Sequence, residues 1–247
     1  DFTATSSVTL TERIITPKEF QVNLQLCKTP FRDDWDAVSM GYSAFDNLPP
    51  DFQSFLVAHV AEKVATKMEN NIWQGADANE GEFDVIVALA TADADVVDVV
   101  GTTVTAANVI DELGKVVDAI PAALYGSADL KLYVAQNVYR AYVRALGGFA
   151  ATGANGVDNR GTMWYADGGG VSFDGIKIFM AEGLANDRML AAQISNLYYG
   201  VSLLSDTQEA RVIDVSQYDG SDNVRVVMRM AAGAQIGVAS DVIYYGA

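Results

Sequence analysis

The sequence of 247 residues has few of the side chains on which many catalytic and metal sites depend. Its one cysteine, Cys27, excludes an internal disulfide, and its strand-like setting predicts a buried apolar residue. Its one histidine, His59, falls inside a predicted helix, which favours a structural role over nucleophilic catalysis. A zinc site on one His and one Cys would also need two carboxylates, which no spacing supports. We therefore expect no metal and no cofactor.

Basic residues are scarce, with 16 Lys and Arg against 32 Asp and Glu and a formal net charge of -16. A protein that grips nucleic acid needs a concentrated positive footprint, and no basic run is present. An acidic protein can still enclose DNA without adhering to it. With so many acids, neighbours such as Asp33 and Asp34 arise by chance, so no carboxylate pair indicates an enzyme.

Long apolar runs and nucleotide-binding glycine motifs are also missing. The longest apolar stretch, residues 85–101, is interrupted by Asp93, Asp95 and Asp98, which excludes an ordinary membrane-spanning helix. Neither G-x-G-x-x-G nor the P-loop motif occurs, and residues 77–82 place Glu82 where a calcium loop needs glycine. We therefore expect no membrane partner and no phosphate or calcium site.

Three helices are predicted from apolar spacing. The first begins at Asp51, after two prolines, and continues to Gly75 with an unbroken row of apolar residues four apart. At about 1.5 Å per residue it would be roughly 33 Å long. The second runs from a cap at Thr105 to Pro121, and the third covers residues 138–146.

The remaining regular structure is expected to be mostly β. Residues 83–104 suggest strand and connecting loop, residues 130–134 alternate as a strand, and Asp174 and Gly175 predict a hairpin turn between 171–173 and 176–179. Further strands are expected at 189–192, 197–204, 210–215 and 223–232, and glycine-rich residues 147–170 at a loop. Helices and strands in this order predict an α+β fold.

Residues 8–26 predict a β-hairpin that turns at 16–19. In its second strand Phe20, Val22, Leu24 and Leu26 alternate with polar residues, so one face needs cover. An isolated hairpin is marginally stable in water, so other segments must supply that cover. The pattern leaves open whether they come from this chain or from another one.

Four stretches in order, residues 15–28, 48–75, 105–121 and 221–230, resemble the major capsid proteins of tailed bacteriophages, whose fold is named after phage Hong Kong ninety-seven. The resemblance implies an α+β subunit with an extended β-hairpin arm, a peripheral lobe with a long spine helix and long strands, and an axial α+β lobe. It places the N-terminal segment and arm at 1–49, the peripheral lobe at 50–82 and 201–236, and the axial lobe at 83–200, with 237–247 returning to it.

The resemblance also implies site residues. The arm would contact neighbouring subunits and be covered by them, through Ile15, Lys18, Phe20, Val22, Leu24 and Leu26. The core row of the spine helix would consist of Phe52, Leu56, Val60, Val64 and Met68.

The function implied by the resemblance is structural and not enzymatic. Copies of the chain would form hexamers and pentamers in an icosahedral phage head, assembled in the host cytoplasm, that encloses double-stranded DNA without sequence-specific binding. Portal, scaffold and decoration proteins would be further partners. Two alternatives stay open: an encapsulin-like compartment that encloses a cargo protein, and a carboxylate-based hydrolase in which the glycine-rich loop acts as a lid.

Overall fold

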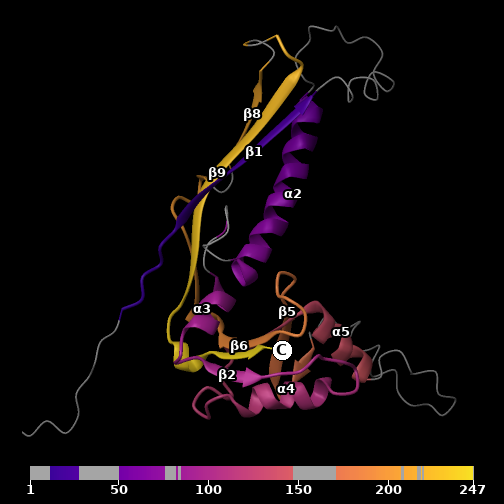
Figure 1. The fold of residues 1–247 in the computed structure, drawn as a ribbon, viewed down its shortest axis with the longest axis vertical. Helices are drawn as coiled ribbons and strands as arrows, with labels where there is room; N and C mark the ends of the chain where they lie inside the picture. Colours follow the sequence, from indigo (N-terminus) through magenta and orange to yellow (C-terminus); the bar gives the residue numbers. More distant parts are fainter. Residues whose placement is uncertain are drawn as a thin grey trace, which may run out of the picture.

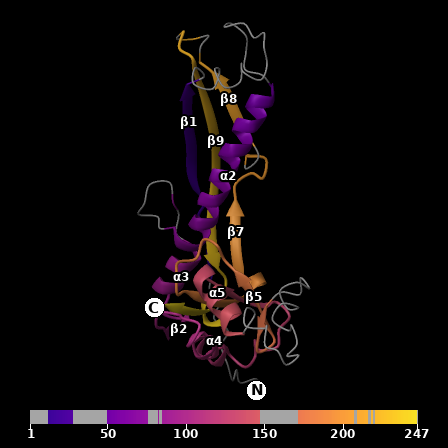
Figure 2. The same ribbon diagram turned by 90° about the vertical axis from the view of Figure 1, so that its right-hand side faces the viewer.

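Two sheets of different shape organise the chain in the computed structural model, which describes residues 12–27, 50–75, 82, 85–146, 171–206, 209–215, 218 and 220–246. A long, narrow sheet and one long helix form an upper lobe, which stands on a lower lobe built around the second sheet (Figure 1). The view turned by 90° shows how slender the upper lobe is (Figure 2).

The upper lobe consists of helix α2 (Pro50–Gln74) and four antiparallel strands. Its central strand is β9 (Asn223–Ile236). Strand β1 (Lys18–Cys27) pairs with one edge of β9, while β8 (Ala210–Asp214) and β7 (Leu197–Val201) pair one after the other with the opposite edge. We call the sheet face toward α2 the inner face and the opposite one the outer face.

The lower lobe contains a six-stranded sheet in the order β2-β10-β6-β3-β5-β4. Its strands are β2 (Val97–Val100), β3 (Leu130–Val134), β4 (Ser172–Phe173), β5 (Ile176–Met180), β6 (Met189–Gln193) and β10 (Ile243–Gly246). Helix α4 (Val109–Asp118) packs on β6 and β10 and beside α5 (Gln136–Ala145), and short helix α3 (Ile86–Ala92) contacts β9 and β10. Two 3-10 turns complete the described structure, at Ile194–Asn196 and Ala239–Asp241.

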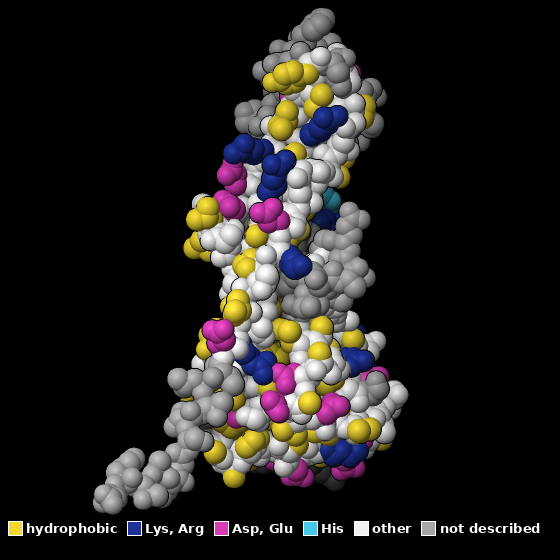
Figure 3. All heavy atoms as spheres, turned by 60° about the vertical axis from the view of Figure 1, so that its left-hand side comes forward, with side chains coloured by type: hydrophobic (Ala, Val, Ile, Leu, Met, Phe, Trp, Pro, Cys, Tyr) yellow, Lys and Arg dark blue, Asp and Glu magenta, His cyan; other side chains and the backbone are white. Residues whose placement is uncertain are grey.

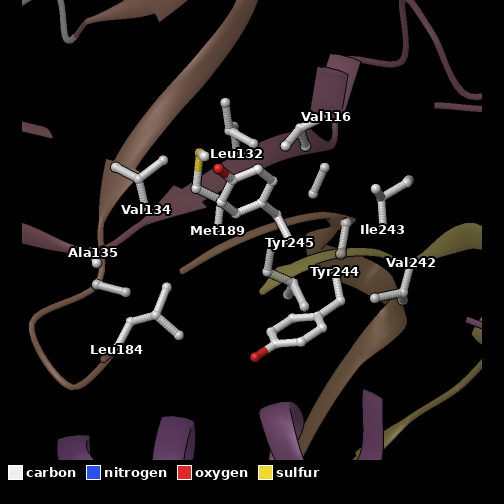
Figure 4. Packing of buried hydrophobic residues seen from close by; sticks show 14 of the residues in the cluster. Val116, Leu132, Val134, Ala135, Leu184, Met189, Val242, Ile243, Tyr244 and Tyr245 are labelled. Carbon is white, nitrogen blue, oxygen red and sulfur yellow. The ribbon is translucent and has the colours of Figure 1, made fainter. Parts of the chain in front are cut away.

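The larger core cluster fills the lower lobe. Tyr244 and Tyr245 of β10 are both fully buried, and their rings point to opposite sides of the sheet, as those of neighbours in a strand must (Figure 4). Leu132 and Met189 pack nearby. The cluster continues up β9 through Ala232, which joins the lower lobe to the upper sheet.

Most predicted elements are confirmed, with three differences. The segment 83–104 contains helix α3 as well as strand β2, and β10 was not predicted as a strand. The prediction of a hairpin at residues 8–26 is wrong, because β1 pairs with β9 and residues 12–17 form no strand. Residues 8–11 and the glycine-rich segment 147–170 lie outside the described residues. The predicted turn at Asp174 and Gly175 is present, with φ of 44° and 82°.

Candidate assembly surfaces

The side chains predicted to form an inter-subunit arm lie mostly on the inner face of the upper sheet. Phe20, Val22, Leu24 and Leu26 are half-buried and pack against a buried cluster formed by α2 and β9. That cluster consists of Val60, Val224, Val226, Met228 and Met230. Because this cover comes from the same chain, the expectation that only neighbouring subunits shelter this face is wrong. The alternation identified a face to bury but carried no information on what buries it.

The predicted core row of the spine helix lies partly within this cluster. Val60 is buried, with 4% of its surface exposed, and Val64 and Met68 are half-buried beside it. The side chains of Phe52 and Leu56 lie outside the described residues. Cys27, expected to be buried, is exposed at the end of β1, because the alternation of the strand turns it away from α2.

A groove of about 390 Å³ runs between β1 and α2. Phe20, Val22 and Leu24 line it from the strand. From the helix it is lined by the apolar Val60, Val64 and Met68 and by the polar His59, Lys63, Lys67 and Asn71. Lys67 is bound to Glu82 at 2.6 Å. Apolar side chains of both elements therefore line the groove, and the helix adds polar and basic ones.

The segment before β1 crosses the outer face of the sheet at a pair of glycines. Gly200 and Gly233 are cross-strand partners, and a Cβ on either would lie within 3.1–3.3 Å of the Ile15 side chain. Gln235 donates a hydrogen bond to the carbonyl oxygen of Ile14, and Arg13 binds Asp93 at 2.6 Å. We call residues 12–17 the strap. Ile15 thus contacts its own sheet, while Lys18, at the start of β1, is exposed.

Hydrogen bonds hold the Asp93 carboxylate at the far end of the strap. The backbone N–H of Asp95 and the guanidinium of Arg13 lower the pKa of Asp93. Asp93 is also the C-cap residue of α3, so one side chain connects the strap to the lower lobe.

The outer face higher up the sheet carries three arginines among polar and acidic residues. Arg225 donates to Gln25 across the β1–β9 pair at 3.0 Å, and Arg211 binds Glu209 at 2.5 Å. Arg229 lies on the same face of β9 as Arg225, beyond Val227, whose cross-strand partner is Arg211, and it helps to line a groove of about 380 Å³. On the face shown in Figure 3, Lys and Arg side chains gather over the upper sheet, with Asp and Glu beside them. This mixture of positively and negatively charged side chains is better suited to contact with a polar protein surface than to binding of a polyanion.

No protein-family model and no curated protein matches the sequence, but solved structures match nearly its whole length. The capsid of an empty GTA particle aligns with a TM-score of 0.61 at 16% identity, covering 98% of this chain and 78% of that one. The procapsid of satellite phage P4 aligns with a TM-score of 0.59 at 12% identity, covering 99% and 77%. A virus-like particle from Pyrococcus furiosus aligns with a TM-score of 0.51 at 10% identity, covering 93% and 77%.

The chain has the fold of phage capsid proteins. The predicted fold class, an α+β major capsid fold, is therefore confirmed. At these identities the likeness is one of fold alone, so the capsid fold identifies the architecture of this subunit and not the residues that join it to others.

The capsid fold here contains a buried polar cluster that the sequence analysis missed. Glu112 of α4 is 5% exposed and accepts hydrogen bonds from Tyr245 at 2.7 Å, Thr102 at 3.1 Å and Lys115 at 2.9 Å. Burial raises the pKa of Glu112, but the three hydrogen bonds and the Lys115 charge together outweigh it and the net pKa is lowered. Burial and the bond to Glu112 raise the pKa of Tyr245 to about 12.

This cluster explains how the C-terminal strand is fixed. The Tyr245 hydroxyl also accepts from the Thr102 backbone N–H at 2.9 Å, so one side chain of β10 is tied both to α4 and to the segment after β2. Every polar atom named is paired, which is the condition under which a buried carboxylate is tolerated. The contacts are those of a structural clamp between α4, β10 and the segment after β2. The only sign of this cluster in the sequence was an acidic residue, Glu112, among the apolar residues of a predicted helix.

The described ranges contain little that suggests catalysis. Within them Glu112 is the one buried acid, and no three His, Cys, Asp or Glu side chains come together as they would around a metal ion. None of the helices in those ranges combines the length and hydrophobicity needed to span a lipid bilayer.

Proposed function

We propose that this chain is the structural major capsid protein of a tailed double-stranded DNA phage and self-assembles into its icosahedral head shell. One observation carries the proposal: the fold aligns, over at least 98% of the chain, with subunits of a GTA capsid and of the P4 procapsid. A shell protein needs several surfaces that repeat around symmetry axes and needs no catalytic constellation. Hexamers and pentamers of one chain would supply such contacts, and portal, scaffold and decoration proteins would join them.

In this proposal the upper lobe is the peripheral lobe and the lower lobe is the axial lobe. The sheets support the assignment, because β1, β7, β8 and β9 share the upper sheet and β10 lies in the lower sheet between β2 and β6. Strand β7 begins at Leu197, so we place the return to the peripheral lobe at residue 197, where the sequence suggested 201. Residues 237–247 return to the axial lobe through β10.

The acidic composition supports the proposed contents. At a formal net charge of -16, a shell of many copies would enclose double-stranded DNA without trapping it on its wall. The product would be located in the virion after assembly in the host cytoplasm. The likeness to the Pyrococcus furiosus particle favours the encapsulin-like compartment as the second candidate.

Electron microscopy of the purified protein, followed by analysis of nuclease-protected contents, tests the proposal. We expect closed particles of uniform size, and protected double-stranded DNA when particles are taken from cells in which the phage genome replicates. A protein passenger in place of DNA would favour the compartment. A chain that stays monomeric at every concentration and salt condition would overturn both.

A further inference from the structure

The groove between β1 and α2 exists because the helix does not cover the whole inner face of the upper sheet. Helix α2 runs beside β1 and β9 (Figure 1). On that face Phe20 and Val22 of β1 are the cross-strand partners of Met230 and Met228 of β9. The two methionines are buried, with 9% and 6% of their surface exposed, whereas their β1 partners are only half-buried. The helix therefore lies over β9 and leaves an apolar strip of β1 open at its side.

The lining of the groove is apolar along its length and carries basic side chains on the helical side only. Val60, Val64 and Met68 follow one another at intervals of four residues on α2 and line the groove together with the apolar side chains of β1. The helical row one residue earlier is polar and includes Lys63 and Lys67. Among the described residues no Asp or Glu lines the groove, although acids outnumber bases in the chain by 32 to 16. An occupant with a negative charge therefore meets cations here and no acid.

Lys63 is the cation that this lining leaves available. Lys67 binds Glu82 at 2.6 Å, so its charge is already compensated. Lys63 is one helical turn earlier and exposed, and it has no acidic partner within the described part of the chain. Glu62, its neighbour in the sequence, does not line the groove. The flexible stem of a lysine can lie along an apolar row while its ammonium group stays at the rim.

The dimensions of the groove suit a small amphiphilic molecule. Its volume of about 390 Å³ is within the range of about 300–1,000 Å³ that is usual for ligand sites. An α-helix with its side chains is about 10 Å across, so a helical peptide would fill this volume within about one turn. An extended peptide would lay backbone N–H and C=O groups against the apolar wall, at a cost that an alkyl chain avoids. A single alkyl chain with one anionic end therefore matches the shape, the polarity and the charge of the groove.

We propose that the groove binds a fatty acid, with the alkyl chain between β1 and α2 and the carboxylate at Lys63. The alkyl chain completes the burial of the half-buried side chains of β1, and this burial of apolar surface supplies the affinity. The Lys63 ammonium group donates a charge-assisted hydrogen bond to the carboxylate and so fixes the direction of the chain. The inference goes beyond the proposed function and does not require the subunit to assemble.

Binding of dodecanoate to the full-length protein, below the concentration at which dodecanoate forms micelles, tests the inference. Isothermal titration calorimetry should show saturable binding of one molecule per chain. Lys63→Gln should weaken this binding at least about tenfold, because it removes the charge that holds the carboxylate. Lys177→Gln makes the same change at an exposed lysine of β5 in the lower lobe and should leave the affinity unchanged.

The sign of the head group gives a further control. Dodecyltrimethylammonium has the same alkyl chain and the opposite charge, so it should bind at least about tenfold more weakly than dodecanoate. The net charge of -16 on the chain would by itself favour the cationic compound. A preference for dodecanoate therefore reports on the local cation and not on the charge of the whole protein.

A variant that fills the groove supplies a second measurement. Val64→Phe should lower the affinity for dodecanoate at least about tenfold, because its ring occupies the space of the alkyl chain, while the circular dichroism spectrum stays that of the wild type. Unchanged affinity of Val64→Phe would place the site elsewhere and overturn the inference. Absence of saturable binding, or equal affinity of the wild type and Lys63→Gln, would also overturn it.

Two other occupants are outcomes of the same test. If dodecanoate does not bind and Val64→Cys, combined with Cys27→Ser, resists a maleimide, a segment of protein fills the groove. If dodecanoate does not bind but vesicles of anionic phospholipid retain the protein, the ligand is a membrane lipid. Either result overturns the inference. Particle formation plays no part in these measurements, so their failure leaves the proposed function standing.

Discussion

Gly183 lies where the loop after β5 touches the backbone of α2. A Cβ at this position would lie 2.4 Å from the carbonyl oxygen of Glu69, and Gln74 at the end of α2 donates a hydrogen bond to the carbonyl of Gly183. The helix of the upper lobe and a loop of the lower lobe therefore meet backbone to backbone. At this point only a residue without a side chain fits.

We expect Gly183→Ala to destabilise the fold by about 1–3 kcal/mol, because the added methyl group meets backbone that cannot move aside. Urea unfolding followed by circular dichroism measures the loss. Gly114→Ala is the matched control, since Gly114 lies within α4 with nothing within 4 Å of its Cβ position. It should stabilise the fold by about 0.5–1 kcal/mol. Equal stability of the two variants would contradict the close contact.

Glu112 should make stability depend on pH in the acid range. Its pKa is lower in the folded state than the ordinary value of 4.5, so the ionised carboxylate stabilises the fold fully above that value. The stabilisation is lost as the pH falls through the lowered folded pKa. We expect Glu112→Gln to cost about 1–3 kcal/mol at neutral pH and progressively less below about pH 4.5.

Urea titrations of the wild type and of Glu112→Gln between about pH 7 and pH 3 check this expectation. Asp118→Asn, at an exposed acid on the same helix, is the control and should cost much less at neutral pH. A difference between the wild type and Glu112→Gln that stays constant over the whole range would show that the carboxylate charge is not what stabilises the clamp.

Among the elements, β1 shows most clearly that a sequence pattern does not distinguish packing within the chain from packing between chains. Its alternating residues would look the same in either case, but the structure places them against Val60 and the even-numbered residues of β9. Phe20 also contacts the larger core cluster of the lower lobe. Strand β1 is therefore part of the subunit fold itself.

Phe20→Asp should accordingly lower the stability of the isolated subunit, since it places a charge against both core clusters. We expect a loss of about 2–4 kcal/mol, seen as a lower midpoint of thermal unfolding. Gln21→Asp introduces the same residue at the neighbouring position on the outer face and should change the midpoint little. If Phe20→Asp kept the wild-type midpoint and lost only the ability to form particles, the cover of β1 would come from neighbours after all.

Strand β9 connects the elements of both lobes. Its first half pairs with β8 and its second half with β7, while β1 spans residues 223–232 on the other edge. Its even-numbered residues belong to the smaller cluster up to Met230 and to the larger cluster from Ala232 onward. One strand therefore belongs to both cores, which couples the position of one lobe to that of the other.

At the scale of the whole molecule, the excess of acidic over basic residues makes subunits repel one another and so opposes the contacts between them. A formal charge of -16 on each subunit opposes association, and added salt screens it, because the Debye length falls from about 10 Å at 0.1 M to about 3 Å at 1 M. We expect the yield of particles to rise over this range, as measured by light scattering and checked by microscopy. A yield that falls with salt would mean that attraction dominates assembly, through ion pairs between subunits such as those the outer-face arginines could form.

The sequence by itself determined the α+β class, the extent of the long helix, most strands and the absence of any familiar catalytic motif. These features are local: apolar spacing, caps and turn residues act over a few positions, so they can be read without knowing what lies opposite. Helix α3 was missed because its seven residues are too few to show a helical period against a valine-rich, strand-like background.

Only the tertiary structure decided which segments cover one another. It gave β1 a partner some 200 residues away in the sequence, brought Glu112 of α4 against Tyr245 of β10, and carried the strap over the glycines of β7 and β9. An alternation of apolar and polar residues shows that one face of a strand must be buried. The hydrophobic effect is non-directional, however, so the alternation does not identify the surface that covers this face. That choice depends on the shape of the whole chain, which no single stretch contains.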